Sequence, residues 1–327
     1  MKEIILVASS ELPKDCFKEL SNHANSFFIQ DLSDDVLDRI LPTVNCMIFN
    51  AWPSRLDSTR VEMMGNLKVI QSMKGGVDDI PFEHIQRNVR VYNTIGAYAT
   101  EVAEHAIALL LSAAKSIVEF NLLLRTKVED DAPLSGEFSI QTIKGKSLGI
   151  IGYGNIGKIV AKYAKGLGMK VFAFARHTQG KTTATVYLGR NGMRRILRTC
   201  DMILLALPLS ETTRGIVSKE ELAMLKDDAI MVNVGRGDTV DQVALYDKML
   251  NNPRFIYATD VWWYKGKGET FSADLPFSSL SNFIATPHVS GPLATMSGRM
   301  PKIAIDNLLR YLNGKTPRNR VYHKEQD

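Results

Sequence analysis

The sequence lacks paired cysteines, long apolar runs and internal repeats. Its three cysteines are widely spaced and form no Cys-x-x-Cys pair, which excludes a disulfide framework and a cysteine-based zinc site. The longest apolar stretch, Val102–Ala114, is interrupted by Glu104 and His105, so we expect no membrane span. The histidines also show no metal-binding pattern. These absences predict a soluble protein of the reducing cytoplasm that holds no metal.

A strong excess of one charge is also absent. The 40 lysines and arginines are nearly balanced by 35 acidic residues, and the basic residues are scattered along the chain. A nucleic-acid-binding protein would gather them on one face, so we expect neither a nucleic-acid nor a membrane partner. With 327 residues, of which 45% are hydrophobic, the chain has enough apolar material for two cores. We therefore expect two domains.

Short apolar runs alternate with longer helical patterns, which is typical of parallel sheets covered by helices. In the second half, strands are expected at residues 147–151, 171–175, 202–206, 230–233, 256–259 and 283–285. Six strands joined by crossovers predict a doubly wound Rossmann sheet. Earlier apolar runs predict strands at residues 4–8, 46–50, 69–73 and 91–93. Helices are expected over residues 100–121, 156–167, 218–225 and 298–312.

A glycine-rich loop, Gly152-Tyr153-Gly154-Asn155-Ile156-Gly157, lies between an expected strand and an expected helix. In this setting the first glycine permits a tight turn and the second lets the backbone approach a pyrophosphate. The third lets helix and strand pack closely, while the helix N-terminus offers free N–H groups to the anion. The loop therefore predicts a dinucleotide cofactor.

The acid that many NAD-binding folds place after the second strand is missing. The strand ends 18 residues after Gly157, at Ala175, and Arg176 and His177 follow it. An arginine can bind a 2′-phosphate with its planar fork, and Lys181 adds positive charge nearby. We therefore favour NADP over NAD, or the use of both. The alternative is that Arg176 stacks on adenine and NAD is accepted.

Several motifs together resemble the D-isomer-specific 2-hydroxyacid dehydrogenases. That family includes D-lactate, D-glycerate, phosphoglycerate, formate and phosphite dehydrogenases and glyoxylate/hydroxypyruvate reductases. The motifs occur in the family's order over nearly the whole chain. Besides the glycine loop they are Met73-Lys74-Gly75-Gly76-Val77-Asp78, Glu101-Val102-Ala103-Glu104-His105, Leu207-Pro208 with Thr212-Thr213, Asn233-Val234-Gly235-Arg236-Gly237, Thr259-Asp260-Val261 and Thr286-Pro287-His288.

The resemblance implies an α/β protein in which a doubly wound parallel Rossmann sheet is inserted into a smaller, flavodoxin-like α/β domain. Residues 1–95 and 291–327 would form the substrate domain, and residues 96–290 the dinucleotide-binding domain. The resemblance also implies an active site in the cleft and a homodimer formed partly through an excursion at residues 127–145.

The same resemblance assigns the chemistry. Arg236 would clamp the carboxylate and carbonyl of a small 2-oxo acid with its planar fork. His288 would donate or accept the proton, since imidazole can do both near neutral pH. Asp260 would lie near the nicotinamide. The expected cofactor contacts are Thr100, Gly152, Gly154, Asn155, Ile156, Gly157, Arg176, His177, Leu207, Pro208, Thr213, Val234, Gly235, Arg236, Asp260 and His288.

The substrate side is expected to involve the turn at Gly75 and Gly76, whose small residues let backbone N–H groups approach a carboxylate. Lys74 adds charge there or is simply solvated. Trp52 is either a wall of the substrate pocket or a hydrophobic staple in the core. The tandem residues Trp262 and Trp263 are candidates for the opposite wall.

One departure from the family pattern concerns the glutamate that normally pairs with the histidine. Lys265 stands at its usual position, five residues after Asp260, and a lysine there would disfavour a protonated imidazole. Glu269 is a candidate replacement. The alternatives are that Glu104 takes this role or that the site works without a carboxylate.

Three functions remain open at this point. The leading one is reduction of glyoxylate, hydroxypyruvate or a similar 2-oxo acid to the 2-hydroxy acid, which has the D configuration where it is chiral. The second is oxidation of a smaller anion, as in formate and phosphite dehydrogenases, which Lys74 keeps open. The third is a cofactor-sensing protein without turnover, like the corepressor branch of the family. Retention of both Arg236 and His288 argues against the third.

Overall fold

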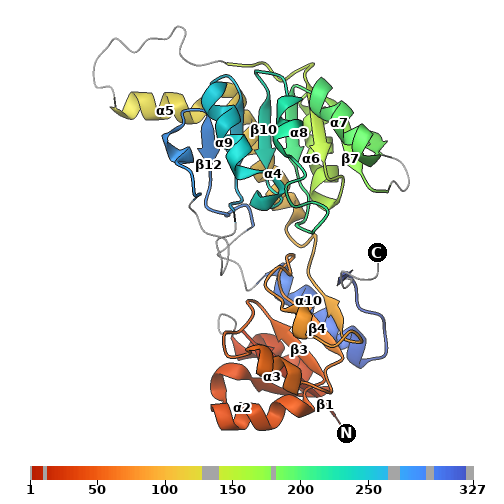
Figure 1. Cartoon of the computed structure of the whole chain (residues 1–327). Helices are drawn as coiled ribbons and strands as arrows, with labels where there is room; N and C mark the ends of the chain where they lie inside the picture. The colour runs from red at the N-terminus through yellow and green to blue at the C-terminus, as the bar shows by residue number, and fades with distance from the viewer. Residues whose placement is uncertain are drawn as a thin grey trace. The chain divides into compact units, whose positions relative to one another are not determined.

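A computed structural model of the chain describes residues 2–9, 13–126, 140–177, 182–263, 273–291 and 298–321. The chain divides into two compact units (Figure 1). One is formed by Met1–Ala97 together with Pro292–Asp327, and the other by Tyr98–Gly291. The first unit is therefore built from both ends of the chain, and the second is continuous.

The first unit contains a six-stranded sheet with the order β13-β5-β4-β3-β1-β2. All neighbouring strands are parallel except β13, which pairs antiparallel with β5. Without β13 this is the flavodoxin-like order, in which β2 is added on one side of β1 and the later strands are added on the other side. The strands are β1 (Glu3–Ala8), β2 (Ala24–Phe28), β3 (Cys46–Phe49), β4 (Val69–Ser72), β5 (Arg90–Tyr92) and β13 (Arg320–Val321).

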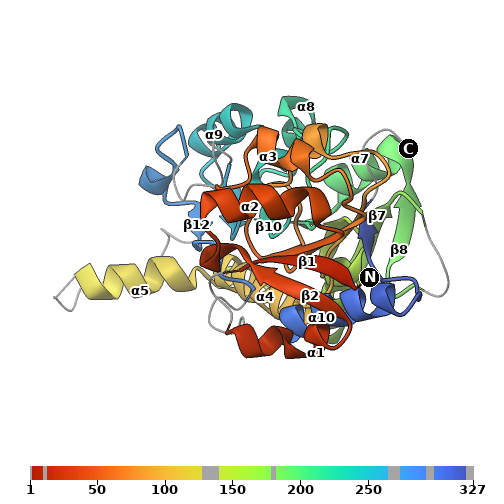
Figure 2. The ribbon, with the colours of Figure 1, turned by 90° about the horizontal axis from the view of Figure 1, so that it is seen from below.

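Helices cover both faces of this sheet (Figure 2). On one face α2 (Asp34–Ile40) and α3 (Ser58–Met63) pack over side chains such as Met47. On the other face α1 (Lys18–Ser21) and α10 (Arg299–Leu312) pack over side chains such as Ile48. Both faces of the central strands are buried, which is why those strands read as continuous apolar runs.

The second unit contains a seven-stranded, all-parallel sheet with the order β12-β11-β10-β9-β6-β7-β8. This is a doubly wound arrangement, and its strand order reverses between β6 and β9. The strands are β6 (Ser147–Ile151), β7 (Lys170–Ala175), β8 (Thr185–Leu188), β9 (Met202–Leu205), β10 (Ile230–Asn233), β11 (Ile256–Thr259) and β12 (Phe283–Ala285).

Two helix layers enclose the second sheet. One apolar core lies under α4 (Ala99–Lys115) and α6 (Asn155–Gly166). A second core lies on the opposite face, under α7 (Gly189–Thr199), α8 (Lys219–Ala223) and α9 (Gln242–Asn251). Short 3₁₀ turns complete the described structure at Lys14–Phe17, Ile29–Asp31, Leu41–Thr43, Phe82–His84, Gly237–Thr239 and Phe277–Ser279. The predicted α/β class and its two sheet types are confirmed.

All six strands predicted in the second half are present, and β8, which was not predicted, adds a seventh among the described residues. This strand is short and only half-buried at the edge of the sheet, so it carries no strong apolar signal. The strands β2 and β13 were missed for the same reason. They lie at the two edges of the first sheet and are largely exposed or half-buried.

The single helix predicted over residues 100–121 is two helices. Ser116 adopts a left-handed conformation with φ 48°, which ends α4, and α5 (Ile117–Thr126) then projects from the second unit (Figure 1). The two helices meet at 64°. Among the described residues, no single helix is long and apolar enough to cross a membrane. Only this bent pair reaches that length and composition, and it does so jointly.

Candidate functional site

The glycine loop connects β6 to α6 at the point where the strand order of the second sheet reverses. Gly152 has φ 111°, and a Cβ there would stand 2.6 Å from the backbone oxygen of Ala206. A Cβ on Gly157 would stand 2.3 Å from the oxygen of Gly152. Both positions therefore require glycine, one for its conformation and both for the close approach of the backbone.

The middle glycine of this loop has a different environment. A Cβ on Gly154 would meet nothing within 4 Å, so the loop has open space on that side. Asn155 and Ile156 begin α6 next to this space, and the first N–H groups of a helix lack intrahelical partners. Open space beside free N–H groups is what a pyrophosphate requires. The loop therefore fits a dinucleotide on the geometry of the chain itself.

The end of β7 lies next to the glycine loop in the sheet, since β6 and β7 are hydrogen-bonded neighbours. Arg176 and His177 follow β7 and are exposed. The hydroxyl of Tyr153 accepts a hydrogen bond of 3.0 Å from the backbone N–H of Thr183. This hydrogen bond connects the glycine loop to the segment after β7, and no sequence motif predicted it. Lys181 lies outside the described residues.

Arg236 lies in the loop after β10, and the loop backbone is fixed from several sides. Asn233 is fully buried; its side chain accepts from the N–H of Gly235 at 3.0 Å and donates to the backbone oxygen of Arg236 at 3.0 Å. The hydroxyl of Thr239 also donates to that oxygen, at 2.6 Å. The guanidinium itself donates to the oxygen of Gly235 at 2.8 Å. A rigid backbone of this kind determines where the arginine side chain begins.

The two glycines that flank Arg236 lie against neighbouring loops. A Cβ on Gly235 would stand 2.5 Å from the backbone oxygen of Leu207, and one on Gly237 would stand 2.3 Å from that of Trp262. The loops after β9, β10 and β11 are therefore in close contact around Arg236. Seven of the sixteen predicted cofactor contacts lie in these loops, namely Leu207, Pro208, Thr213, Val234, Gly235, Arg236 and Asp260.

Four residues in this region differ in exposure. Pro208 is exposed, Leu207 and Thr213 are half-buried, and Val234 is buried at 5% exposure. The hydroxyl of Thr213 donates to the backbone oxygen of Pro208 at 2.7 Å and so closes the turn after β9. Thr100, the remaining predicted cofactor contact, is exposed in the first turn of α4. These residues keep their cofactor assignments as predictions.

His288 follows β12 in a turn that closes around the carboxylate of Asp260. This carboxylate is fully buried and accepts the hydroxyl of Thr286 at 2.5 Å and the N–H groups of Val289 and Ser290 at 2.9 Å each. His288 itself is half-buried and has φ 51°. Because β10, β11 and β12 are parallel neighbours, Arg236, Asp260 and His288 all follow the carboxyl ends of adjacent strands.

His105 lies on α4 and belongs to the same cluster. Its Nε2 is 2.9 Å from the hydroxyl oxygen of Thr286 and 3.6 Å from Oδ1 of Asp260. From the sequence, His105 is expected to be a packed, hydrogen-bonded residue of a buried helix, but no local pattern links it to Thr286. Glu104, considered as a substitute carboxylate, is exposed on α4. Glu269 and Lys265 lie outside the described residues.

The tandem tryptophans occupy different environments. Trp263 is 5% exposed, stacks on Phe277 with ring centroids 5.1 Å apart, and donates to the backbone oxygen of Val240 at 2.9 Å. Trp263 was expected beside the substrate, but these contacts place it in the core of the second unit. The half-buried Trp262 donates its indole N–H to the backbone oxygen of Thr286 at 2.9 Å, so it supports the turn that carries His288.

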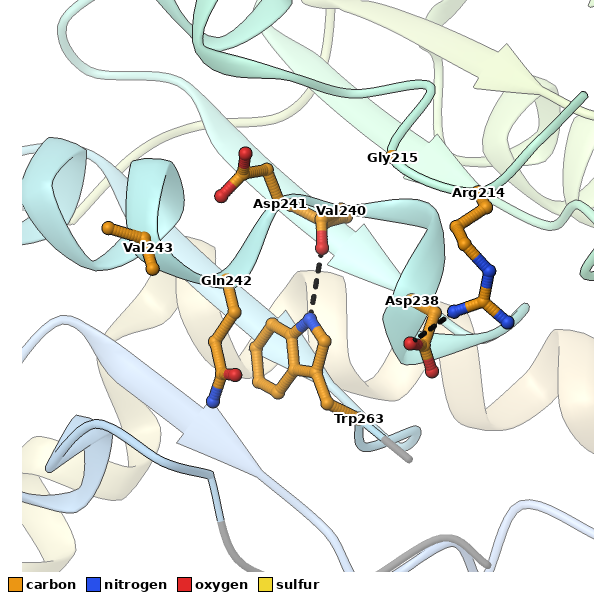
Figure 3. Close-up of a pocket in the computed structure, with 8 residues that line it drawn as sticks. All are labelled: Arg214, Gly215, Asp238, Val240, Asp241, Gln242, Val243 and Trp263. Atoms are coloured by element: carbon orange, nitrogen blue, oxygen red, sulfur yellow. Dashed lines mark hydrogen bonds and ion pairs between the residues drawn. The ribbon is translucent and has the colours of Figure 1, made fainter. Parts of the chain in front are cut away.

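An open pocket of about 310 Å³ lies next to the buried Trp263 (Figure 3). On one side of it Arg214 pairs with Asp238 at 2.7 Å, which ties the turn at Gly215 to the loop that carries Arg236. Among the described residues, Trp263 is the one residue of the predicted site that lines this pocket. Its lining residues are Arg214, Gly215, Asp238, Val240, Asp241, Gln242, Val243 and Trp263.

Besides Arg236, the residues expected to bind substrate are Trp52, which follows β3, and Lys74, Gly75 and Gly76, which follow β4 in the first unit. Trp52 packs edge-on against Phe49 at 5.4 Å and donates its indole N–H to the backbone oxygen of Leu56 at 3.1 Å. These are the contacts of the packing alternative. The turn at Lys74 and Gly75 is held by the Thr94 N–H at 3.0 Å and by a bond of 2.8 Å from Asn93. The following residue, Gly76, is half-buried.

Comparison with known proteins places these features in a family. Residues 107–290 match the family described as "D-isomer specific 2-hydroxyacid dehydrogenase, NAD binding domain". The hydroxypyruvate reductase of Thermotoga maritima is 30% identical over 284 residues, covering 86% of this chain and 90% of that protein.

Solved structures agree with this match. A Pyrobaculum aerophilum protein, named provisionally as a formate dehydrogenase, is 30% identical with a TM-score of 0.79, covering 98% of both chains. An NADPH-dependent glyoxylate/hydroxypyruvate reductase from Sinorhizobium meliloti has a TM-score of 0.78 at 20% identity. It covers 98% of this chain and 97% of its own, and at that identity it supports the fold alone.

Proposed function

Because the chain belongs to the D-isomer-specific 2-hydroxyacid dehydrogenase family and is an NAD(P)-dependent oxidoreductase, we propose that it reduces a small 2-oxo acid to the D-2-hydroxy acid. The observation that carries this proposal is the placement of Arg236 after β10 and of His288 after β12, the two strands that flank β11, at the same carboxyl-terminal end of the parallel sheet as the glycine loop. Glyoxylate and hydroxypyruvate are the first candidates, since relatives are named for them.

The cofactor would be held by the glycine loop and the N-terminus of α6, with Arg176 and His177 at its ribose end. When bound, the nicotinamide supplies the hydride that turns the carbonyl into a hydroxyl. Arg176 favours NADP(H), because a guanidinium binds a phosphate with two parallel hydrogen bonds. Val234, Leu207 and Asp260 would line the nicotinamide side.

Each site residue then has one task. Arg236 binds the substrate carboxylate and polarises the carbonyl with its planar fork of donors. His288 gives its proton to the oxygen that becomes the hydroxyl, and it takes the proton back in the reverse direction. We propose the first unit as the substrate domain, in which Lys74 and the N–H groups of Gly75 and Gly76 would contribute to binding of the substrate. Trp52 would contact the substrate side chain. Glu269 stays a candidate partner of His288.

We also propose a homodimer, formed partly through the excursion at residues 127–145, of which residues 127–139 lie outside the described residues. The helix α5, which directly precedes the excursion, would be part of the same interface. Leu122 and Leu124 on this helix are 60% and 69% exposed, and Ile117 at its start is 55% exposed. Apolar side chains gathered on one projecting helix are typical of protein–protein contacts. The reducing cytoplasm remains the predicted location, which fractionation of the cells would test.

The function is tested by incubating the purified protein with NADPH or NADH and a panel of 2-oxo acids while the absorbance of the reduced cofactor is followed. We expect turnover of a 2-oxo acid that His288→Ala lowers by about 10²–10⁴-fold, the range of general acid catalysis. His23→Ala, at an exposed histidine with no role in the proposed site, is the matched control for catalysis and should keep kcat. Absence of turnover with tight cofactor binding would instead favour a sensor without catalysis.

A second candidate function is oxidation of a small anion. The similarity to the Pyrobaculum aerophilum protein and the position of Lys74 both favour it. The same purified protein is therefore assayed with formate and phosphite in the presence of NADP⁺ or NAD⁺. Turnover of either anion at a higher kcat/KM than any 2-oxo acid would replace the leading proposal.

A further inference from the structure

The turn from Thr286 to Ser290 is organised by one buried carboxylate. Asp260 accepts the hydroxyl of Thr286 on Oδ1, the N–H of Val289 on the same oxygen and the N–H of Ser290 on Oδ2. Its side chain is 0% exposed. Three donors from five consecutive residues therefore converge on a group that solvent does not reach, and this fixes the path of the chain on both sides of His288.

His288 adopts a backbone conformation that a non-glycine residue rarely takes. Its φ is 51°, and its N–H donates to the backbone oxygen of Thr286, two residues earlier, at 3.0 Å. Left-handed conformations of this kind persist only where the surrounding structure determines them. The carboxylate of Asp260 is the surrounding group that binds the turn before and after His288. The direction in which the imidazole leaves the backbone therefore depends on it.

The direction of each hydrogen bond follows from counting protons. A threonine hydroxyl has one proton, and a carboxylate only accepts. The proton of Thr286 must therefore point to Asp260, so its oxygen must accept from Nε2 of His105. The Nε2 nitrogen of His105 thus carries a proton whether the ring is neutral or charged. A directional chain runs from His105 through Thr286 to Asp260.

Thr286 is also anchored independently of its hydroxyl. The backbone N–H of Thr286 donates to the backbone oxygen of Thr259 at 2.9 Å, and the backbone oxygen of Thr286 accepts the indole N–H of Trp262 at 2.9 Å. Removing the hydroxyl alone should therefore leave the backbone of this residue in place. Only the link between His105 and Asp260 would be lost.

We propose that His105 and Thr286 are positioning residues for His288: His105 orients the hydroxyl of Thr286, which holds the Asp260 carboxylate that closes the turn around His288. This proposal rests on the proposed role of His288 as the proton donor. The device acts on the backbone that carries the imidazole, whereas a partner glutamate would act on the ring.

The kinetic test compares Thr286→Val, which keeps the shape and removes the hydroxyl, with Thr286→Ser, which keeps the hydroxyl. We expect Thr286→Val to lower kcat at least about 10-fold, since small displacements of a catalytic group cost one to two orders of magnitude. The KM for the cofactor should change less than about 3-fold, and Thr286→Ser should retain at least about half of kcat. Equal kcat values for the two variants would overturn the proposal.

His105 is tested in the same way with a donor and a non-donor. The amide of His105→Gln retains an N–H group that can reach a hydroxyl, and His105→Leu does not. We expect His105→Leu to match Thr286→Val and not to worsen it in the double variant, because both break one chain. A double variant whose losses simply multiply would show two separate roles and overturn the proposal.

A second measurement does not depend on turnover. The amide protons of Val289 and Ser290, observed by NMR after selective ¹⁵N labelling, should exchange at least about 10-fold faster in Thr286→Val than in the unmodified protein. Unchanged exchange at both amides would refute the positioning device even if catalysis were lost. If instead the unmodified protein reduces no 2-oxo acid, the proposed function fails and the exchange data still decide this inference.

Discussion

Gly237 lies so close to Trp262 that a Cβ on the glycine would stand 2.3 Å from the carbonyl carbon of the tryptophan. The residue between Gly237 and Gly235 is Arg236, whose backbone is therefore held between the loops after β9 and β11. These close contacts restrict the backbone of Arg236, although the residue lies in a loop. A side chain with a fixed origin and a planar fork is suited to grip a carboxylate in one orientation.

The first prediction concerns the fork of Arg236. Arg236→Lys keeps the charge and loses the paired donors, so we expect kcat/KM for the 2-oxo acid to fall by about 10²-fold or more. The free energy of unfolding, measured with urea, should stay within about 0.5 kcal/mol. Arg198→Lys, an exposed exchange on α7, is the control and should change neither quantity. A loss of kcat/KM below 3-fold would exclude the clamp.

The glycine loop predicts opposite outcomes at two of its glycines. Gly154→Ala should fold normally, because its added methyl meets nothing within 4 Å, but it should weaken binding of NADPH about 10-fold by filling that space. Gly157→Ala should lose about 1–3 kcal/mol of stability, because its methyl would overlap the backbone oxygen of Gly152. Cofactor fluorescence and urea unfolding measure the two effects. Equal stabilities for the two variants would contradict this account of the loop.

Cofactor choice is expected to depend on Arg176. Its replacement by alanine should raise the KM for NADPH about 10-fold or more and change that for NADH less than about 3-fold, since only NADPH carries the 2′-phosphate. Initial rates with both cofactors at saturating substrate measure this ratio. If both KM values rise equally, the residue does not read the phosphate.

Asp201 supplies a prediction on acid stability. Burial by itself would raise its pKa, but hydrogen bonds from Lys226 and Ser147 favour the carboxylate and lower the pKa from 3.8 to about 2. Because the pKa of Asp201 is lower in the folded than in the unfolded protein, the carboxylate stabilises the fold at pH values above its pKa in the unfolded chain. This contribution is lost as the pH falls from about 4 to 2.

At neutral pH the shift corresponds to about 2 kcal/mol. Asp201→Asn should therefore lose about 1–2 kcal/mol of unfolding free energy at pH 7, and the difference from the unmodified protein should shrink toward pH 2. Asp227→Asn is the control, because its pair with Arg254 spans 3.5 Å and both side chains are 70% exposed. It should cost less than about 0.5 kcal/mol. A loss that does not vary with pH would sink this explanation.

The proposed dimer can be tested on α5. Leu122→Asp combined with Leu124→Asp places two charges among the exposed apolar side chains of α5, so we expect a shift from dimer to monomer in light scattering. Leu188→Asp, at a leucine that is 53% exposed on β8, is the matched control and should leave the dimer intact. If the double variant and the unmodified protein have the same mass in light scattering, α5 is not part of the dimer interface.

Much of the fold could be predicted from the sequence, because the central strands are buried on both faces and appear as uninterrupted apolar runs. The helix predicted over residues 218–225 is also present as α8, and it begins with a capping box between Ser218 and Glu221. The edge strand β8 and the break at Ser116 were not predictable in this way. An edge strand needs only a weak apolar signal, and a left-handed serine is chosen by its surroundings.

The sequence by itself determined the positions of the buried strands, the glycine loop and the two residue types suited to 2-oxo acid chemistry, because each depends on neighbours within a few positions. Only the tertiary structure decided how His288 is held. His105 and Thr286 are 181 positions apart, and Asp260 reaches the turn from a different strand. Such contacts depend on which strand ends the fold brings together, and local residue patterns carry no record of that.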